Sequence, residues 1–222
     1  MKTPVVTARP ENTEEGAAAA LIVIDVINDL EFEGGVQLLE HALPMADRLA
    51  ALAARARAVG IPVIYANDNF GRWRSDFRAL LHRCLTSPVR GRPVVERLQP
   101  GPDDYFVLKP KHSGFYATVL PTLLEHLQVS TLILTGLATN MCVLMTAADA
   151  HMRDYTLSVP EDCVAAEHPR DHAWALHHMA TVFDADVRPS TALDLAALTK
   201  ARPPGGARGR APSPAPVAPP LK

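Results

Sequence analysis

Short apolar runs recur along the chain, each four to six residues long, and longer stretches separate them. The runs lie at 21–26, 62–66, 105–108, 131–135 and 156–159. Each is too short for a helix, and most are apolar at consecutive rather than alternate positions. Continuous apolar runs are typical of strands that are covered on both faces. The pattern therefore predicts a buried parallel β-sheet.

Amphipathic stretches fill the intervals between these runs and predict helices. They lie at 43–59, 116–127, 140–153 and 169–182. Gly60 and Pro62 follow the first stretch, and glycine and proline at such positions are ordinary helix stop signals. Strand and helix alternate about five times, which predicts a doubly wound α/β domain. The active groups of such a domain lie at the carboxyl ends of its strands.

The two ends of the chain differ in composition from its middle. Residues 1–16 are polar and contain Pro4 and Pro10, and residues 202–222 hold seven of the chain's 20 prolines. Such a composition buries little apolar surface and favours extended, disordered chain. We predict a flexible leader at 1–16, a single folded domain at 17–199 and a Pro-rich disordered tail at 200–222.

Composition and charge narrow the classes of function. The 222 residues are 48% hydrophobic and 21% charged, which is close to average for a soluble globular protein. Without the five positive charges of the tail, the net charge falls from −2 to −7. An acidic body argues against nucleic-acid binding by the main fold, since phosphate contact requires clustered Lys and Arg.

Cysteine usage and hydropathy indicate the compartment. Cys84, Cys142 and Cys163 are an odd number without close pairs, which is typical of a reducing compartment rather than a disulfide scaffold. No apolar stretch approaches the roughly 18 residues that span a membrane, and the N-terminus has no signal-peptide core. We therefore expect a cytoplasmic protein without a membrane partner.

Two charged residues stand at the ends of predicted strands. Asp25 ends the first and Lys109 ends the third. A buried carboxylate is costly without a partner or a task, so Asp25 is a candidate catalytic group; alternatively, its side chain caps the following loop. Lys109 is a candidate counter-charge, although most lysines are solvated and Lys111 lies two residues further on.

Cys142 follows the fourth strand, near the start of a predicted helix. The amides and dipole of a helix N-terminus stabilise an anion and can lower a thiol pKa, so Cys142 is a candidate nucleophile; the alternative is a small buried hydrophobic residue. Cys84 and Cys163 lack this setting and are interpreted as structural. In the strand order 3-2-1-4-5-6, strands one and four are neighbours, which places Asp25 beside Cys142 as base and nucleophile.

These residues resemble the isochorismatase-like cysteine hydrolases, which include nicotinamidases and carbamoylsarcosine amidohydrolases. The resemblance covers about 17–189, and its most specific part is GLATNMCV at 136–143, followed by TA at 146–147 and DA at 149–150. The early acid of the family matches Asp25. Its lysine, four residues before a Ser-small-Phe group, matches Lys109 rather than Lys111.

The resemblance implies further features of the fold and the site. It implies a sheet of six parallel strands in a single three-layer α/β/α domain, and a cis peptide bond between Leu137 and Ala138. It also implies an oxyanion hole formed by the backbone amides of Ala138 and Cys142. Losing one donor of such a hole typically costs about 2.7 to 4 kcal/mol of barrier.

This chain departs from the patterns of two branches of the family, the nicotinamidases and the true isochorismatases. Nicotinamidases carry a metal-binding Asp-x-His after the second strand, where this chain has Asp68, Asn69 and Phe70. Phe70 cannot ligate a metal, so we expect no metal site and interpret Asp68 as an ordinary loop acid. True isochorismatases have no cysteine at the nucleophile position and cleave a vinyl ether. Cys142 therefore favours acyl transfer.

The substrate pocket is predicted from aromatic and polar residues near strand ends. Asn69, Phe70, Trp73 and Phe115 are the candidate substrate-binding residues, while the alternative for the loop at 67–77 is an ordinary surface loop covering the sheet. Four histidines cluster on one helical stretch, without the acids or cysteines of a metal site, and are interpreted as a solvated face. They are His168, His172, His177 and His178.

The resulting hypothesis is a metal-independent cysteine hydrolase, without a cofactor, that cleaves a C–N bond of a small amide or ureido substrate through Cys142, Asp25 and Lys109. We expect a small-molecule substrate and a homo-oligomer. The alternatives are an isochorismatase-type ether hydrolase and a non-catalytic binding or scaffold subunit, because fold alone does not determine function.

Overall fold

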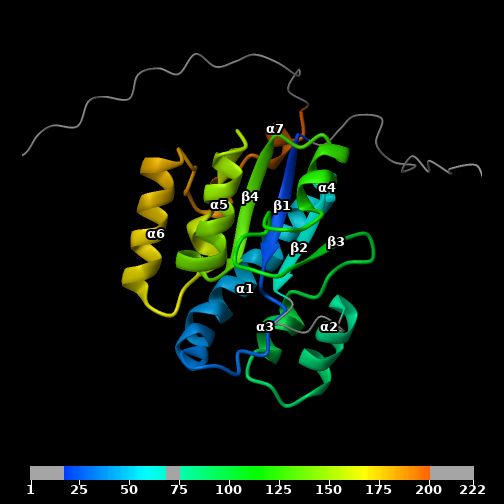
Figure 1. The fold of residues 1–222 in the computed structure, drawn as a ribbon, viewed down its shortest axis with the longest axis vertical. Helices are drawn as coiled ribbons and strands as arrows, with labels where there is room; N and C mark the ends of the chain where they lie inside the picture. The colour runs from blue at the N-terminus through cyan, green and yellow to red at the C-terminus, as the bar shows by residue number, and fades with distance from the viewer. Residues whose placement is uncertain (1–17, 69–75, 201–222) are drawn as a thin grey trace, which may run out of the picture.

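A parallel β-sheet forms the centre of the protein in the computed structural model, which describes residues 18–68 and 76–200 (Figure 1). Its strands are β1 (Ala19–Ile24), β2 (Val63–Asp68), β3 (Tyr105–Lys109), β4 (Thr131–Leu137), β5 (Thr156–Ser158) and β6 (Val164–Ala165). All six residues of β1 are buried, as expected for a strand covered on both faces. The prediction of a parallel-sheet α/β domain is confirmed.

The strand order corrects one detail of the prediction. Five strands follow the order β3-β2-β1-β4-β5, but β6 pairs with β4 instead of lying outside β5. The short β5 pairs only with the first half of β4, at Thr131–Ile133. This leaves the second half of β4 open, and β6 pairs there with Gly136 and Leu137. The expected fifth and sixth strands thus share one edge of the sheet.

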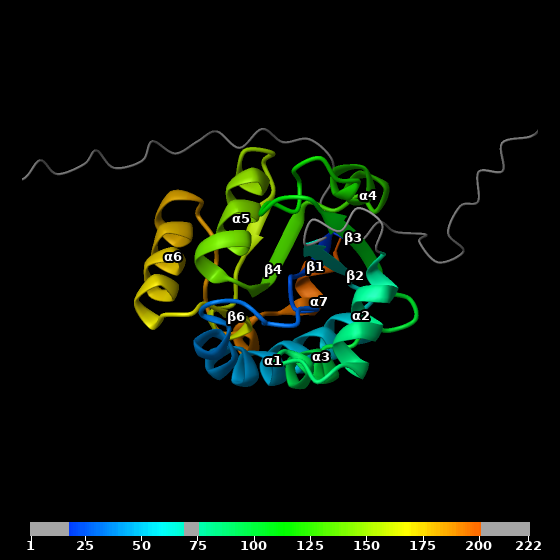
Figure 2. The same ribbon diagram turned by 60° about the horizontal axis from the view of Figure 1, so that its bottom comes forward.

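Helices cover both faces of the sheet, and Figure 2 shows α1, α2 and α3 below it and α4, α5 and α6 above it. The helices are α1 (Gly35–Ala58), α2 (Phe77–Thr86), α3 (Arg92–Arg97), α4 (Leu120–His126), α5 (Leu144–His151), α6 (Pro169–Val182) and α7 (Leu195–Leu198). Leu21 and Val23 face the core on the α1 side, while Ile22 and Ile24 face the core on the α5 side. Two apolar cores therefore fix the sheet between the helical layers.

The helix boundaries agree with the sequence pattern at α6, which spans the predicted 169–182. Helix α1 begins eight residues before the predicted start at 43 and continues through Pro44. Proline is usual in a first turn, which explains the misplaced start. The predicted helix at 140–153 divides into a π-helical turn, η1 (Thr139–Val143), and α5. Helices α2 and α3 were not predicted.

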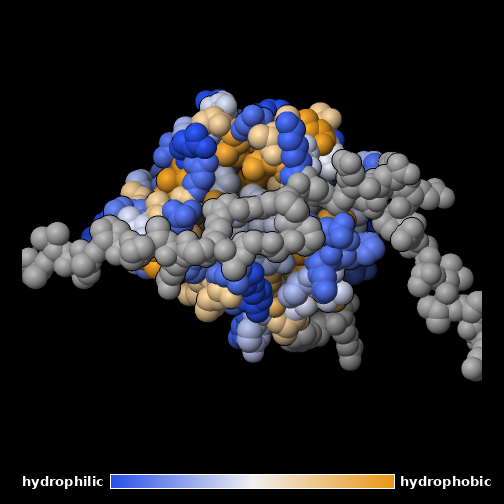
Figure 3. Space-filling model, turned by 90° about the horizontal axis from the view of Figure 1, so that it is seen from above, coloured by the Kyte–Doolittle hydropathy of each residue, from blue (hydrophilic) through white to orange (hydrophobic). Residues whose placement is uncertain are grey.

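The predicted leader at 1–16 and nearly all of the predicted tail lie outside the described residues, so both stay predictions. Within the described part, no helix is long and apolar enough to cross a membrane. The view along the sheet from above shows polar and apolar residues intermixed around the grey segments (Figure 3).

Candidate active site

Three of the predicted residues meet at the carboxyl ends of β1, β3 and β4. The Lys109 ammonium nitrogen, Nζ, lies 2.8 Å from Oδ2 of Asp25 and 3.5 Å from Sγ of Cys142. Lys109 is fully buried, Asp25 is almost fully buried, and Cys142 is partly exposed. The strand order β3-β2-β1-β4 makes this meeting possible, because Asp25 lies between the strands that carry the other two groups.

Asp25 is held by the backbone of β2. Its N–H donates to the carbonyl of Ala66 at 3.1 Å, and its Oδ1 accepts the N–H of Asp68 at 2.7 Å. The φ angle of Asp25 is 52°, in the left-handed region that aspartate tolerates better than most residues. The turn directs the carboxylate toward Lys109 instead of continuing the strand.

Cys142 is carried by a turn that begins where β4 ends. Gly136 has a φ of 104°, and a Cβ at this position would collide with the carbonyl oxygen of Ile24. The peptide bond between Leu137 and Ala138 is cis. The carbonyl of Ala138 then accepts the N–H groups of Met141 and Val143, and the carbonyl of Cys142 accepts the Thr146 hydroxyl at 2.7 Å. The thiol is therefore presented by a tightly bonded turn, η1, ahead of α5.

Burial determines the resting charge state of the thiol. Burial, followed by the negative charge of Asp25, raises the pKa of Cys142 to about 12, while Lys109 opposes both effects. This differs from the expectation that a helix N-terminus lowers the thiol pKa. Here the desolvation of the thiol outweighs the dipole, because the charged form loses its water. This setting favours the neutral thiol of Cys142 over the thiolate.

The Asp25 carboxylate is placed to accept the proton of that thiol. Burial raises the pKa of Asp25, against the lowering effect of Lys109, so its carboxylate is more basic than an exposed one. Burial lowers the pKa of Lys109, but its interactions with the carboxylates of Asp25 and Asp68 and with Cys142 outweigh burial, and the net pKa is raised. A protonated Lys109 beside a basic carboxylate and a neutral thiol is suited to general-base activation of the sulfur.

Two further residues border this group, and the sequence analysis missed both. Oδ2 of Asp68 lies 3.6 Å from Nζ of Lys109, and Nδ1 of the exposed His112 lies 3.6 Å from Sγ of Cys142. Asp68 is therefore not the ordinary loop acid that was predicted. The signal was available, since β2 lies between β1 and β3, and a carboxylate ending it must stand between Asp25 and Lys109.

The geometry separates the two candidate lysines. Lys109 is opposite Asp68 in the β2–β3 register and points into the site. Lys111 is exposed and contributes only its backbone carbonyl, which accepts a hydrogen bond from Nζ of Lys109 at 3.2 Å. The choice of Lys109 by family spacing agrees with this arrangement.

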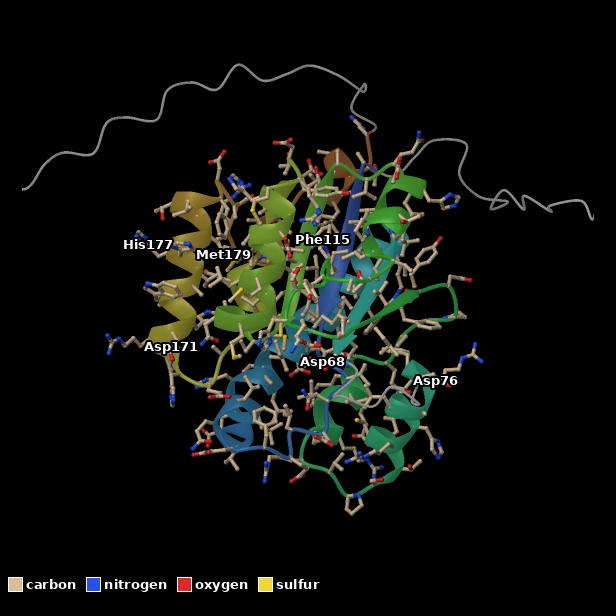
Figure 4. All side chains as sticks on the ribbon, viewed as in Figure 1. Asp68, Asp76, Phe115, Asp171, His177 and Met179 are labelled. Carbon is tan, nitrogen blue, oxygen red and sulfur yellow. The ribbon has the colours of Figure 1, made fainter. Side chains whose placement is uncertain are left out.

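The predicted substrate-binding residues have different outcomes. Asn69, Phe70 and Trp73 lie outside the described residues. Phe115 is buried in the core beside α5, where its ring packs on Tyr155 and beneath the Arg153 guanidinium. Figure 4 shows Phe115 well along the sheet from Asp68, so the structure does not bring it to the site.

The histidines of α6 do not form one solvated face. His168 and His177 are exposed, but His172 is half-buried and its Nδ1 lies 2.9 Å from the Thr139 hydroxyl. His178 stacks on Trp174. In residues 18–68 and 76–200, no group of three or more His, Cys, Asp or Glu side chains is arranged to hold a metal ion.

Comparison with known proteins identifies the family. A family model described as the isochorismatase domain matches residues 19–190. The chain belongs to the isochorismatase family. The predicted family is thereby confirmed, and Cys142, Asp25 and Lys109 all lie within the matched region.

Relatives in this family support the comparison along most of the chain. The uncharacterized isochorismatase family protein YaaI of Bacillus subtilis is 39% identical over 171 residues, covering 77% of this chain and 93% of YaaI. The ureidoacrylate amidohydrolase RutB of Methylorubrum extorquens is 31% identical over 206 residues, covering 79% and 82%. The N-carbamoylsarcosine amidase of Thermoplasma acidophilum matches in structure with a TM-score of 0.61 and 26% identity, covering 79% and 98%.

Proposed function

We propose that this chain is a metal-independent cysteine hydrolase that cleaves a C–N bond of a small amide or ureido compound. The observation that carries the proposal is the contact of the buried Lys109 with both the Asp25 carboxylate and the Cys142 sulfur. Relatives named as an ureidoacrylate amidohydrolase and an N-carbamoylsarcosine amidase support the class of bond. Both names describe hydrolysis next to a nitrogen.

The proposed reaction has two stages. In the first, Asp25 accepts the thiol proton as Sγ of Cys142 attacks the substrate carbonyl, and the same proton passes to the nitrogen that leaves as ammonia or an amine. In the second, Asp25 accepts a proton from water, whose oxygen attacks the thioester carbon. The C–S bond then breaks, the acid is released, and the proton returns from Asp25 to Sγ of Cys142. Lys109 keeps Asp25 ionised before each attack.

The charge that develops on the substrate oxygen requires donors near the sulfur. The backbone amides of Ala138 and Cys142 belong to the turn that presents the thiol, and they form the oxyanion hole of the proposed mechanism. Because these donors are backbone groups, side-chain substitution does not remove them. Their position depends instead on the conformation of the turn.

A panel of primary amides and ureido acids, assayed for released ammonia, tests the proposal directly. We expect at least one compound to release ammonia in proportion to enzyme, with the acid as second product. Release of pyruvate from a vinyl ether without ammonia would favour the ether hydrolase. Absence of turnover on both classes, together with a Cys142 that reacts no faster than a buried thiol, would favour the scaffold.

Metal removal should leave activity unchanged. The prediction rests on Phe70, which stands where nicotinamidase-like proteins carry a metal-ligating histidine. A metal in such relatives helps to bind a pyridine-type ring, so nicotinamide should be a poor substrate of this chain. The measurement is turnover after exhaustive chelation, with metal analysis of the purified protein. Stoichiometric zinc or iron whose removal abolishes turnover would make nicotinamidase the better assignment.

Neutralising Asp68 should narrow the pH range of activity. The charge of Asp68 contributes to the raised pKa of Lys109, so Asp68→Asn lowers that pKa. Lys109 then loses its proton at lower pH. The pH at which kcat/KM falls on the alkaline side therefore moves to a lower value. Because Asp68 is partly exposed at 3.6 Å, we expect a loss of at most about tenfold at neutral pH. Asp103→Asn, in an exposed loop, is the matched control. If the alkaline fall of kcat/KM stays at the same pH in Asp68→Asn, the coupling between Asp68 and Lys109 is contradicted.

A further inference from the structure

His172 lies behind the turn that carries the nucleophile. It stands in the first turn of α6, and its Nδ1 is 2.9 Å from Oγ1 of Thr139. Thr139 is fully buried and is the first residue of η1, three positions before Cys142. A buried hydroxyl that lost its partner would carry a desolvation cost, so this hydrogen bond is a firm attachment of the turn to α6.

The turn is anchored on two opposite sides by side-chain hydrogen bonds. On one side, Thr146 of α5 donates to the carbonyl of Cys142 at 2.7 Å and accepts the N–H of Gly114 at 3.0 Å. On the other side, the attachment is the contact between His172 and Thr139. Thus Cys142 lies between two hydroxyl groups that connect its turn to separate helices.

A groove beside His172 gives its hydrogen bond to Thr139 a larger share in holding the ring in place. The groove has a volume of about 290 Å³ and lies between α1 and α6, with Met45, Val164 and Pro169 among its lining residues. Because His172 lines this groove, the α1 side of its ring is not closed by a packed core. The groove leaves part of the imidazole ring without packed neighbours, and packed neighbours are what usually hold a side chain in place. The hydrogen bond to Thr139 is therefore the polar contact that fixes this ring against η1.

The surroundings of His172 favour its neutral form. Burial lowers the pKa of His172, the charge of Glu161 raises it, and His41 of α1 lowers it. Arg48 of α1 and Asp162 also line the groove. A neutral imidazole carries one donor and one acceptor nitrogen, so Nδ1 either accepts the Thr139 hydroxyl proton or donates to its oxygen.

We propose that His172 is a positioning residue for the proposed hydrolysis, which holds Cys142 and its backbone amide in place through the hydroxyl of Thr139. It does not contact the substrate. The inference rests on the proposed function for its kinetic test, but its thiol test does not depend on the substrate. Loosening the turn changes the geometry of attack more than the binding of the substrate, so kcat changes and KM does not.

The test compares four variants and one control in the full chain. We expect His172→Ala to lower kcat by about tenfold or more with KM within about twofold. His172→Asn places an amide where Nδ1 lies and should restore kcat to within about threefold of the wild type. Thr139→Val should match His172→Ala, and the double variant should be no worse than either, since both remove one interaction. His177→Ala, exposed on the same helix, should change nothing.

The thiol test separates failure of this inference from failure of the proposed function. Loosening the turn exposes Cys142 and relieves the burial that raises its pKa, so the pH midpoint of its alkylation by iodoacetamide should fall in His172→Ala and Thr139→Val. Melting curves confirm that each variant is folded. The inference is overturned if folded His172→Ala keeps the wild-type midpoint, or if the kcat losses of the single variants multiply in the double variant.

Discussion

Cys142→Ala should reduce hydrolysis by at least about 10⁴-fold and leave the fold intact, because the nucleophile and its partners act as one unit. The side chain is partly exposed at the end of β4, so removing its sulfur creates no sealed cavity in the core. The thiol also carries no stabilising charge in the resting protein, since burial keeps it neutral. Stability should therefore change little, as measured by thermal unfolding.

The other two cysteines provide the control for that result. Cys84 and Cys163 are fully buried, whereas Cys142 is partly exposed and lies beside the Asp25 carboxylate that can accept its proton. Mass spectrometry after brief alkylation of the native protein should therefore find the label on Cys142, and labelling should proceed in parallel with inactivation. Alkylation of Cys163 in place of Cys142, or near wild-type turnover by Cys142→Ala, would disprove the mechanism.

The sequence predicted the layers of the fold, but it did not predict how the strands pair at one edge of the sheet. The run at 21–26 predicted a strand buried on both faces, and β1 is such a strand. The sixth strand was misplaced because β5 and β6, of three and two residues, give no periodicity that could establish which half of β4 each one pairs with. Pairing at that edge depends on tertiary contacts. Likewise, Pro44 concealed the first two turns of α1.

The sequence predicted the site residues that lie at strand ends, but not those that come from other elements. Asp25, Lys109 and Cys142 all follow apolar runs, so topology alone brings them together. His172 comes from a helix that also carries the exposed His177, and only the packing of α6 against η1 shows its contact with Thr139. Phe115 shows the opposite error, because an aromatic residue near a strand end was assigned to a pocket and belongs to the core.

Charge balance explains why the site needs a buried lysine. Lys109 lies within 3.6 Å of two carboxylates and 3.5 Å of the thiol, and none of its side chain is exposed. Removing an ion from water is costly unless partners compensate for the loss. The two carboxylates compensate for the burial of Lys109, and Lys109 in turn keeps Asp25 ionised. The charges that would carry out the chemistry are therefore also those that make the site stable.

Lys109→Ala should lower kcat/KM by at least about a hundredfold, because the charge it supplies to Asp25 and to the sulfur is worth a few kcal/mol in the transition state. Lys111→Ala should have little effect, since the Lys111 side chain is exposed and the carbonyl that it offers to Nζ survives the substitution. Lys109→Ala also leaves Asp25 buried without its cation, and breaking such a pair typically costs about 3 to 5 kcal/mol of stability. Activity and unfolding must therefore be measured together.

A double variant separates the loss of chemistry from the loss of stability. Lys109→Met removes the cation while keeping the side chain's length, and Asp25→Asn removes the anion that it leaves unpaired. The pair of substitutions should recover most of the stability lost in Lys109→Met, because no uncompensated charge remains buried. It should recover no activity, because the base is gone. A stable Lys109→Met protein that retains near wild-type kcat/KM, or a greater loss in Lys111→Ala, would reassign the role of the lysine.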